Sequence, residues 1–290
     1  MELNEVHITA MTRFRKSVRP EEVKRELAPG QSPELLKALH LLDRTGKLHA
    51  DSRRKLKQVN HLVRLLTPAL DDMFERHPEP VIVDAAAGNA YLGFILYELF
   101  LALAGKGSMV AVEPRADLAE RTAERATSLG YERLRVLCSS LSSAALPDRV
   151  HMLVALHACD TATDDALVTA IERGADHVAV VPCCQAEVAK QLSGKEDDAD
   201  PALAPLWRHR WHRREFGAHL TNVIRSLVLE AYGYQVTVTE LTGWEHSLKN
   251  ELILGRRVHR ENRRARRQLE DLLARIPFAR PSIVRALKVG

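Results

Sequence analysis

Two acidic residues stand at the ends of the first two expected strands, Asp84 and Glu113. A turn with Gly88 follows Asp84, and a helical stretch starts near Tyr91. Such a strand–turn–helix aims backbone N–H groups and a helix N-terminus at a ligand beyond the strand ends. The acid after the second strand can accept hydrogen bonds from both ribose hydroxyls of a nucleoside cofactor. The spacing between the two acids is usual for one β-α-β unit, so a cofactor site is the favoured interpretation.

The first turn lacks a full Gly-x-Gly pattern, because Ala86 and Ala90 stand where glycines are expected. The pyrophosphate of a nicotinamide cofactor needs a closer glycine cluster. An acid before the glycine suits a ligand that carries an ammonium group, and S-adenosylmethionine (SAM) is such a ligand. We therefore expect SAM as cofactor, with eight candidate binding residues: Asp84, Gly88, Asn89, Tyr91, Glu113, Ser139, Ser140 and His157.

Polar and sulfur side chains crowd the ends of two further strands. His157, Cys159 and Asp160 follow the fourth, and the pair Cys183 and Cys184 follows the fifth. Because these strands are neighbours of the first one, their carboxyl ends should converge on one crevice. For methyl transfer the protein positions donor and acceptor and takes up a proton if the acceptor is a hydroxyl. We expect the catalytic residues, as bases, positioners or nucleophiles, among His157, Asp160, Cys183, Cys184 and Lys55.

Two other interpretations of these side chains stay open. An activated thiolate at Cys183 or Cys184 could add to a pyrimidine ring and lead to carbon methylation. His157, Cys159, Cys183 and Cys184 are zinc ligand types, but no C-x-x-C spacing supports a site. We therefore expect no metal. Asp164 and Asp165 also suit the first turn of the following helix through capping and the helix dipole.

Alternation of strands and helices predicts an α/β fold with parallel strands and right-handed crossovers. The expected fold is a doubly wound, mostly parallel seven-stranded sheet with an antiparallel terminal hairpin, an N-terminal helical appendage and a basic C-terminal helix. Expected strands cover residues 81–83, 109–112, 134–137, 150–156, 177–181, 234–241 and 250–255, and expected helices cover 33–43, 53–74, 116–129, 164–173 and 220–232. The expected domains are 1–78 (mostly helical), 79–258 (the cofactor-binding domain, with an insertion at 193–215) and 259–290 (the basic tail).

Composition excludes several classes of protein. With 290 residues, 46% apolar and 28% charged, the chain can bury a sizeable core. It contains no run of about 18 apolar residues, so no transmembrane helix is expected. The first ten residues do not resemble a secretory signal. Four cysteines, two of them adjacent, favour a reducing compartment, and we expect a cytoplasmic protein without a membrane partner.

The charge is uneven: residues 81–205 carry −8, residues 206–225 carry +4 and residues 256–290 carry +8. Trp207 and Trp211 alternate with arginines, a pattern that could stack bases and neutralise phosphates. We expect an RNA partner that contacts 206–225 and 256–267, with both segments flanking the crevice mouth. The alternative is a solvated helix face with tryptophans packed under a loop, and a protein or small molecule as the acceptor.

Several strings together resemble a family of SAM-dependent methyltransferase domains. They are residues 54–60, Asp84 with Gly88, Tyr91 and Leu92, residues 157–166, residues 182–184, and His246 with Lys249 and Asn250. The family is distantly similar to the eukaryotic enzyme that methylates a ribose 2′-hydroxyl in the tRNA acceptor stem. The resemblance covers roughly 33–255 and implies the class I methyltransferase fold and methyl transfer but supplies no acceptor; RNA is favoured by the basic segments instead. A degenerate methyltransferase fold that serves as an RNA-binding scaffold is the non-enzymatic alternative.

Overall fold

The structure is a computed structural model that describes residues 27–156, 158–182, 185–195, 197, 200–241 and 251–289. Its chain divides into two compact units, Met1–Lys57 and Gln58–Gly290. In the first unit, helix α2 (Pro33–Ala38) starts at a proline, and the Ser32 hydroxyl caps it by accepting a hydrogen bond from the Leu35 N–H at 3.1 Å. The helix is shorter than expected because the chain leaves the helical conformation at His40, whose φ is 55°. A turn follows, in which Asp43 accepts N–H bonds from Thr45 and Lys47. Helix α3 (Ala50–Arg76) extends from this unit into the next.

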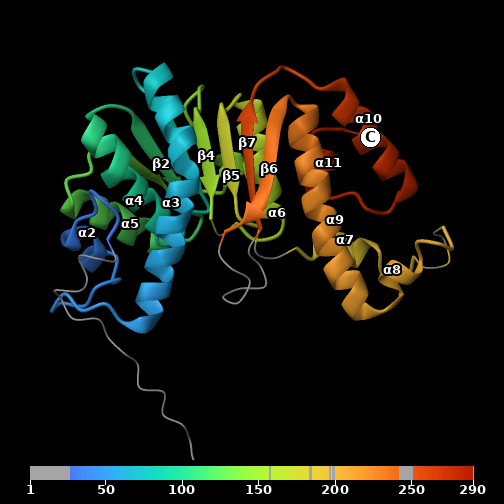
Figure 1. The fold of residues 1–290 in the computed structure, drawn as a ribbon, viewed down its shortest axis with the longest axis horizontal. Coiled ribbons are helices and arrows are strands. Elements are labelled where there is room, and N and C mark those ends of the chain that lie inside the picture. The colour runs from blue at the N-terminus through green and yellow to red at the C-terminus, as the bar shows by residue number, and fades with distance from the viewer. Residues whose placement is uncertain are drawn as a thin grey trace, which may run out of the picture. The chain divides into compact units, whose positions relative to one another are not determined.

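The second unit contains a seven-stranded sheet with the order β3-β2-β1-β4-β5-β7-β6 (Figure 1). Strands β1 to β5 are parallel, and β7 is antiparallel to both β5 and β6. The expected doubly wound sheet with an antiparallel terminal hairpin is therefore confirmed. The strands are β1 (Val81–Ala85), β2 (Ser108–Val112), β3 (Leu134–Leu137), β4 (Met152–Ala155), β5 (His177–Val180), β6 (Tyr234–Glu240) and β7 (Glu251–Arg257).

The strand order reverses between β1 and β4, since the chain proceeds outward from β1 to β3 and then returns to the other side. In open α/β sheets ligands bind beyond the carboxyl ends of the strands at such a reversal. The carboxyl ends of β1 to β5 lie together, because Ala85 pairs with Val112 and Ala155 pairs with Val180. We call this the carboxyl edge and the opposite side the amino edge.

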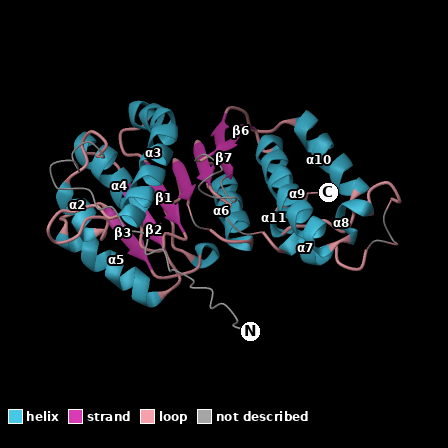
Figure 2. Cartoon of the chain, turned by 60° about the horizontal axis from the view of Figure 1, so that its bottom comes forward, coloured by secondary structure: helices cyan, strands magenta, loops and turns pink. Residues whose placement is uncertain are grey.

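Helices cover both faces of the sheet (Figure 2). One core cluster joins Val83, Leu153 and Val178 to α6 (Thr161–Glu172) and α9 (Arg210–Ala231). On the other face α4 (Tyr91–Leu96) lies close to β1 and β2, because a Cβ on Gly93 would meet both Asp84 and Met109. The π-helix η1 (Tyr97–Ala102) continues α4, and α5 (Ala116–Ser128) connects β2 to β3.

Helix α9 begins at Arg210 rather than near Leu220, so the basic stretch before Leu220 is helical. Two short helices precede it, α7 (Glu187–Gln191) and α8 (Pro205–Arg208). The basic tail forms α10 (Arg263–Arg275) and α11 (Ser282–Ala286), which lie beside α9 in both views (Figures 1 and 2). Within the described part of the chain, we find no helix with the length and hydropathy needed to span a bilayer.

Candidate cofactor and acceptor site

The loop after β1 has an alternating backbone pattern. Ala86, Gly88 and Ala90 have φ values of 54°, 59° and 52°. Glycine adopts this left-handed region without penalty, whereas an alanine there costs roughly 1–2 kcal/mol. The loop therefore has the conformation of a glycine-rich turn, although two of its three left-handed positions are alanine. Such a conformation persists only where the surroundings enforce it, and it is concentrated at ligand-binding sites.

Asp84 is buried inside the domain rather than open to solvent, at 2% exposure. Its Oδ2 accepts a hydrogen bond from the Gly93 N–H at 3.2 Å and so fixes the first turn of α4. Burial raises the pKa of Asp84 to about 7; the nearby Glu113 carboxylate raises it further, and the Gly93 N–H acts in the opposite direction. Asp84 thus anchors the first turn of α4 beneath the loop, and with a pKa of about 7 its carboxyl is only partly ionised at neutral pH.

Glu113 is buried immediately after β2 and reaches back to the loop. Its Oε2 accepts the Gly88 N–H at 2.7 Å, and its Oε1 accepts the Arg115 N–H at 3.1 Å and Nε–H at 2.7 Å. Burial favours the neutral acid, but the bonds from Arg115 and Gly88 outweigh it and hold the pKa of Glu113 below its usual value. A carboxylate therefore stands at the end of β2, covered by a solvent-exposed guanidinium.

The remaining expected cofactor residues that the structure describes lie around the same edge. Ser139, directly after β3, has a buried Oγ without a hydrogen-bond partner among the described residues. Ser140 is engaged locally, because its Oγ lies 2.7 Å from the Ser143 Oγ. Asn89 is exposed and accepts at its carbonyl from Arg125 at 3.4 Å, and Tyr91 is half-buried at the first position of α4.

Asp160 stands directly before α6 with φ 51° and ψ −118°, a strained backbone for a non-glycine residue. Its Oδ1 accepts the N–H groups of Ala186 and Glu187 at 3.1 and 3.3 Å. These two groups open α7, so Asp160 ties the segment after β4 to the segment after β5. Its carboxylate already accepts hydrogen bonds from the chain itself, and this favours a positioning role over that of a free catalytic base.

A buried ion pair supports the Asp160 segment. The Arg225 Nε lies 2.6 Å from Asp164 Oδ1, and its Nη2 donates to the Asp160 carbonyl at 2.7 Å. Asp164 Oδ2 also accepts from the Ser282 hydroxyl and from the Ile283 N–H. Asp164 therefore does more than complement the dipole of α6: it joins α6, α9 and the C-terminal segment.

Three of the expected reactive residues, His157, Cys183 and Cys184, lie outside the described residues. The same holds for the resemblance positions His246, Lys249 and Asn250. Cys159, next to Asp160, is exposed. Lys55 is exposed on α3, in the N-terminal unit.

The described residues include one cluster of metal-ligand types, and it lies at the amino edge: His77, His151 and Asp176. The Val81 N–H donates to His151 Nδ1 at 3.0 Å, so in the neutral ring the other nitrogen carries the proton and has no lone pair for a metal. Arg149 Nη2 lies 2.8 Å from Asp176 Oδ1, so the carboxylate already has a cationic partner in the place of a metal ion. This donor set fits a polar hydrogen-bonded cluster better than a cation.

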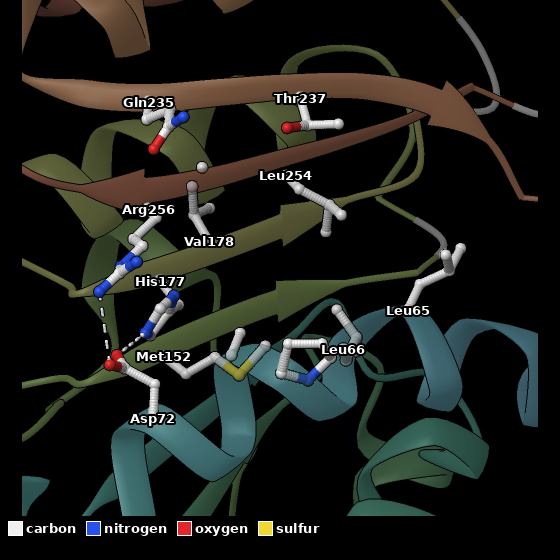
Figure 3. Close-up of a pocket in the computed structure, with 13 residues that line it drawn as sticks. Leu65, Leu66, Asp72, Met152, His177, Val178, Gln235, Thr237, Leu254 and Arg256 are labelled. Carbon is white, nitrogen blue, oxygen red and sulfur yellow. Dashed lines mark hydrogen bonds and ion pairs between the residues drawn. The ribbon is translucent and has the colours of Figure 1, made fainter.

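A hollow of about 280 Å³ opens between α3 and the hairpin (Figure 3). Asp72 of α3 points toward His177 of β5, with 2.8 Å between Oδ2 and Nε2, and toward Arg256 at 3.5 Å. Arg76 binds the same carboxylate at 2.6 Å. With three donors around it, Asp72 fastens α3 to the sheet at the amino edge, away from the loop after β1.

The two tryptophans of the basic stretch have different environments. Trp207 is fully buried and stacks on Phe216, with 5.7 Å between ring centroids. Trp211 is 64% exposed, and the Arg214 guanidinium lies over its ring at 4.1 Å. The packing interpretation therefore holds for Trp207, and a stacking surface is present only at Trp211.

The expectation that both basic segments flank one crevice mouth is wrong. Arg256 of β7 pairs with His177, the first residue of β5, so the segment after β7 starts at the amino edge. The Asn262 N–H binds the Ala231 carbonyl, at the opposite end of α9 from Trp211. At 1.5 Å per residue this places the start of α10 about 30 Å from Trp211. The antiparallel direction of β7 is the reason.

Three important residues were not anticipated: Gly93, Arg115 and Arg225. A Cβ on Gly93 would lie 2.7 Å from Asp84 Oδ2, so only glycine permits this approach of α4 to β1. A glycine five residues after Gly88, inside an apolar helix, is a sequence signal for such close packing. Arg115 and Arg225 gave no comparable signal, because an arginine in a helix or loop is normally solvated.

These residues fit SAM part by part. Glu113 offers a buried carboxylate after β2, and Ser139 offers a hydroxyl without a partner among the described residues; these are group types that a ribose and a nucleobase would need. The left-handed loop presents backbone N–H groups to the methionyl portion. The Asp84 carboxyl lies beneath that loop, and a cationic ligand there would favour its ionised form.

Parts of the chain are similar to known proteins. Residues 54–191 match the model of a family described as "Methyltransferase domain". The chain is 25% identical over 236 residues to the "Glutathione S-transferase C-terminal domain-containing protein" of Homo sapiens and to that of Bos taurus. The match covers 72% of this chain and 34% of each relative, so the chain spans about a third of their length.

Solved structures with a similar arrangement include an SAH-bound methyltransferase from Podospora anserina, where SAH is S-adenosylhomocysteine (12% identity, TM-score 0.46, 83% of this chain and 97% of that one). Another is an rRNA methylase from Streptococcus thermophilus (14% identity, TM-score 0.44, 68% and 96%). Residues 54–191 thus match a methyltransferase domain, and the strand order is that of a doubly wound, Rossmann-like α/β sheet. SAM is the methyl donor that such a domain would use.

Proposed function

We propose that the chain is a SAM-dependent methyltransferase that methylates RNA. The observation that carries the proposal is the carboxyl edge, where a glycine-like loop, the buried Glu113 and the unpartnered Ser139 hydroxyl follow β1, β2 and β3 in order. SAM, when bound, supplies a methyl group activated by its sulfonium. The acceptor can then approach from the ends of β4 and β5, which adjoin β1 on its other side.

The chain's own residues would divide the remaining work. Glu113 would orient the cofactor through its ribose, and Asp84 would hold α4 and the loop in place. Asp160 and Arg225 would keep the segments after β4 and β5 in register. His157 is the proposed base for a hydroxyl acceptor, because an imidazole titrates near neutral pH. Lys55 and the thiols of Cys183 and Cys184 stay as further candidates for acceptor positioning or attack.

RNA is favoured as acceptor because the α9 end at the carboxyl edge is basic and presents an exposed tryptophan. A protein or small-molecule acceptor, and a degenerate scaffold without catalysis, are the alternatives. A ribose hydroxyl is one acceptor within the proposed class. A nucleobase atom is the other.

The direct experiment is to compare modified nucleosides by mass spectrometry in total RNA from a deletion strain and from wild type. One methylated nucleoside should disappear from the deletion strain and return when purified protein and SAM are added to its RNA. If protein and SAM restore no methyl group, the RNA acceptor is contradicted. SAM binding without transfer would then favour another acceptor, and RNA binding without SAM binding would favour the scaffold.

A further inference from the structure

A hollow of about 700 Å³ lies between α7 and the first turns of α9. Four of its eight lining residues are cationic, and none is acidic: Lys190, Arg210, Arg213 and Arg214. Lys190 and Arg210 are exposed. A concave surface of this charge within a domain whose middle segment is acidic is complementary to a phosphodiester.

Trp211 is also part of the hollow. Its exposure is unusual for so large an apolar side chain, and Arg214 holds the indole by lying over the ring. Arg214 also pairs with the exposed Glu215, whose Oε1 lies 2.7 Å from the Arg214 Nη2. An indole has two faces, so a ring held in this way can receive a nucleobase on its second face.

A hydrogen bond joins one wall of the hollow to the segment after β4. Ala186, which lines the hollow, donates its N–H to Asp160 Oδ1 at 3.1 Å, and Asp160 belongs to the segment after β4. The opposite wall of the hollow is equally constrained, since a Cβ on Gly217 of α9 would lie 2.7 Å from the Ala189 backbone nitrogen of α7. The two helices are thus in close contact, and the hollow adjoins the start of α7, which Asp160 ties to the segment after β4.

We propose that this hollow binds an unpaired nucleotide adjacent to the methylated one, with its base on Trp211 and its phosphate near Lys190 and Arg210. The inference rests on the proposed methylation of RNA. Bases inside a duplex are stacked on one another, whereas bases in loops, bulges and ends can be turned out onto an aromatic ring. The preferred substrate is therefore an RNA with unpaired nucleotides at the target.

The test measures binding of a labelled single-stranded RNA of about 12 nucleotides, and of a duplex of the same sequence, by fluorescence anisotropy. Wild type should prefer the single strand. Trp211→Ala should weaken single-strand binding about 10-fold or more and change duplex binding little, and Trp211→Phe should restore most of the loss. Arg210→Glu should also weaken binding, whereas the matched reversal Arg267→Glu at the start of α10 should stay within about 3-fold.

Thermal melting and SAM titration of each variant will show that fold and cofactor site are intact. Equal single-strand affinity of wild type, Trp211→Ala and Arg210→Glu would overturn the inference, as would a wild-type preference for the duplex. Methyl transfer from labelled SAM is measured on the same samples. If wild type methylates RNA while Trp211→Ala does so equally well, only the hollow is wrongly assigned. If wild type binds SAM but neither binds nor methylates RNA, the proposed function fails with it.

Discussion

Arg225 of α9 and Asp164 of α6 form an ion pair of 2.6 Å in which both side chains are 1% exposed. Charges taken out of water are tolerated only with good partners, and here every charged atom is hydrogen-bonded. The pair lies directly behind the strained Asp160 segment. Its geometry therefore matters both to folding and to the placement of the residues after β4.

Asp164→Ala should destabilise the protein by about 3–5 kcal/mol, because it leaves Arg225 buried without a counter-charge. Equilibrium unfolding in urea will measure the change. The neighbouring exposed Asp165 provides the control, and Asp165→Ala should stay within about 0.5 kcal/mol. If Asp164→Ala lowers the free energy of unfolding no more than Asp165→Ala does, the Arg225–Asp164 pair is not buried as described.

Ala86→Gly and Ala90→Gly should each stabilise the protein by roughly 0.5–1 kcal/mol. Each change removes the strain of an alanine in the left-handed region. Part of this stabilisation is offset, because glycine gives the unfolded chain greater conformational entropy. Ala87→Gly is the control, because Ala87 lies between the two positions and has no positive φ. This variant should have a free energy of unfolding about 0.4–1 kcal/mol lower than that of wild type. If all three glycines destabilise alike, the loop does not have the described conformation.

The pKa of Asp84, raised to about 7 by burial, makes the folded state bind a proton that the unfolded state has already lost. Its contribution to stability is therefore full at low pH and is lost as pH rises from about 4 to about 7. Asp84→Asn should gain stability over wild type in that window, with a difference on the order of 4 kcal/mol above pH 7. Urea unfolding from pH 4 to pH 8 will measure it, and a constant difference would contradict the assignment.

Replacing Cys183 and Cys184 together by serine distinguishes the two chemical routes. Transfer to a ribose hydroxyl or an amino group needs no thiolate, so folding and most of the transfer should persist. A variant that binds SAM normally yet transfers no methyl group would favour attack by a thiolate on a pyrimidine ring. Labelled methyl transfer to RNA is the measurement.

Much of the carboxyl edge could be predicted from the sequence, because strand ends followed by acids and small residues have a local signature. Asp84, Gly88 and Glu113 lie where the alternation of strands and helices puts them. The tie between Asp160 and Ala186 could not be predicted, since its partners are 26 residues apart and meet only in the folded sheet. The start of α9 at Arg210 was missed because its polar, basic first turns show no apolar periodicity.

The most direct test of the account is calorimetric titration of SAM into wild type, Glu113→Ala, Arg115→Ala and the exposed control Glu120→Ala. We expect one SAM bound per chain of wild type and of the control. Glu113→Ala should lose about 1–3 kcal/mol of binding free energy, because the ribose hydroxyls lose their buried acceptor. Arg115→Ala should lose less, since Arg115 only covers that acceptor. Absence of SAM binding by wild type, or unchanged affinity in Glu113→Ala, would contradict the cofactor site proposed at the carboxyl edge.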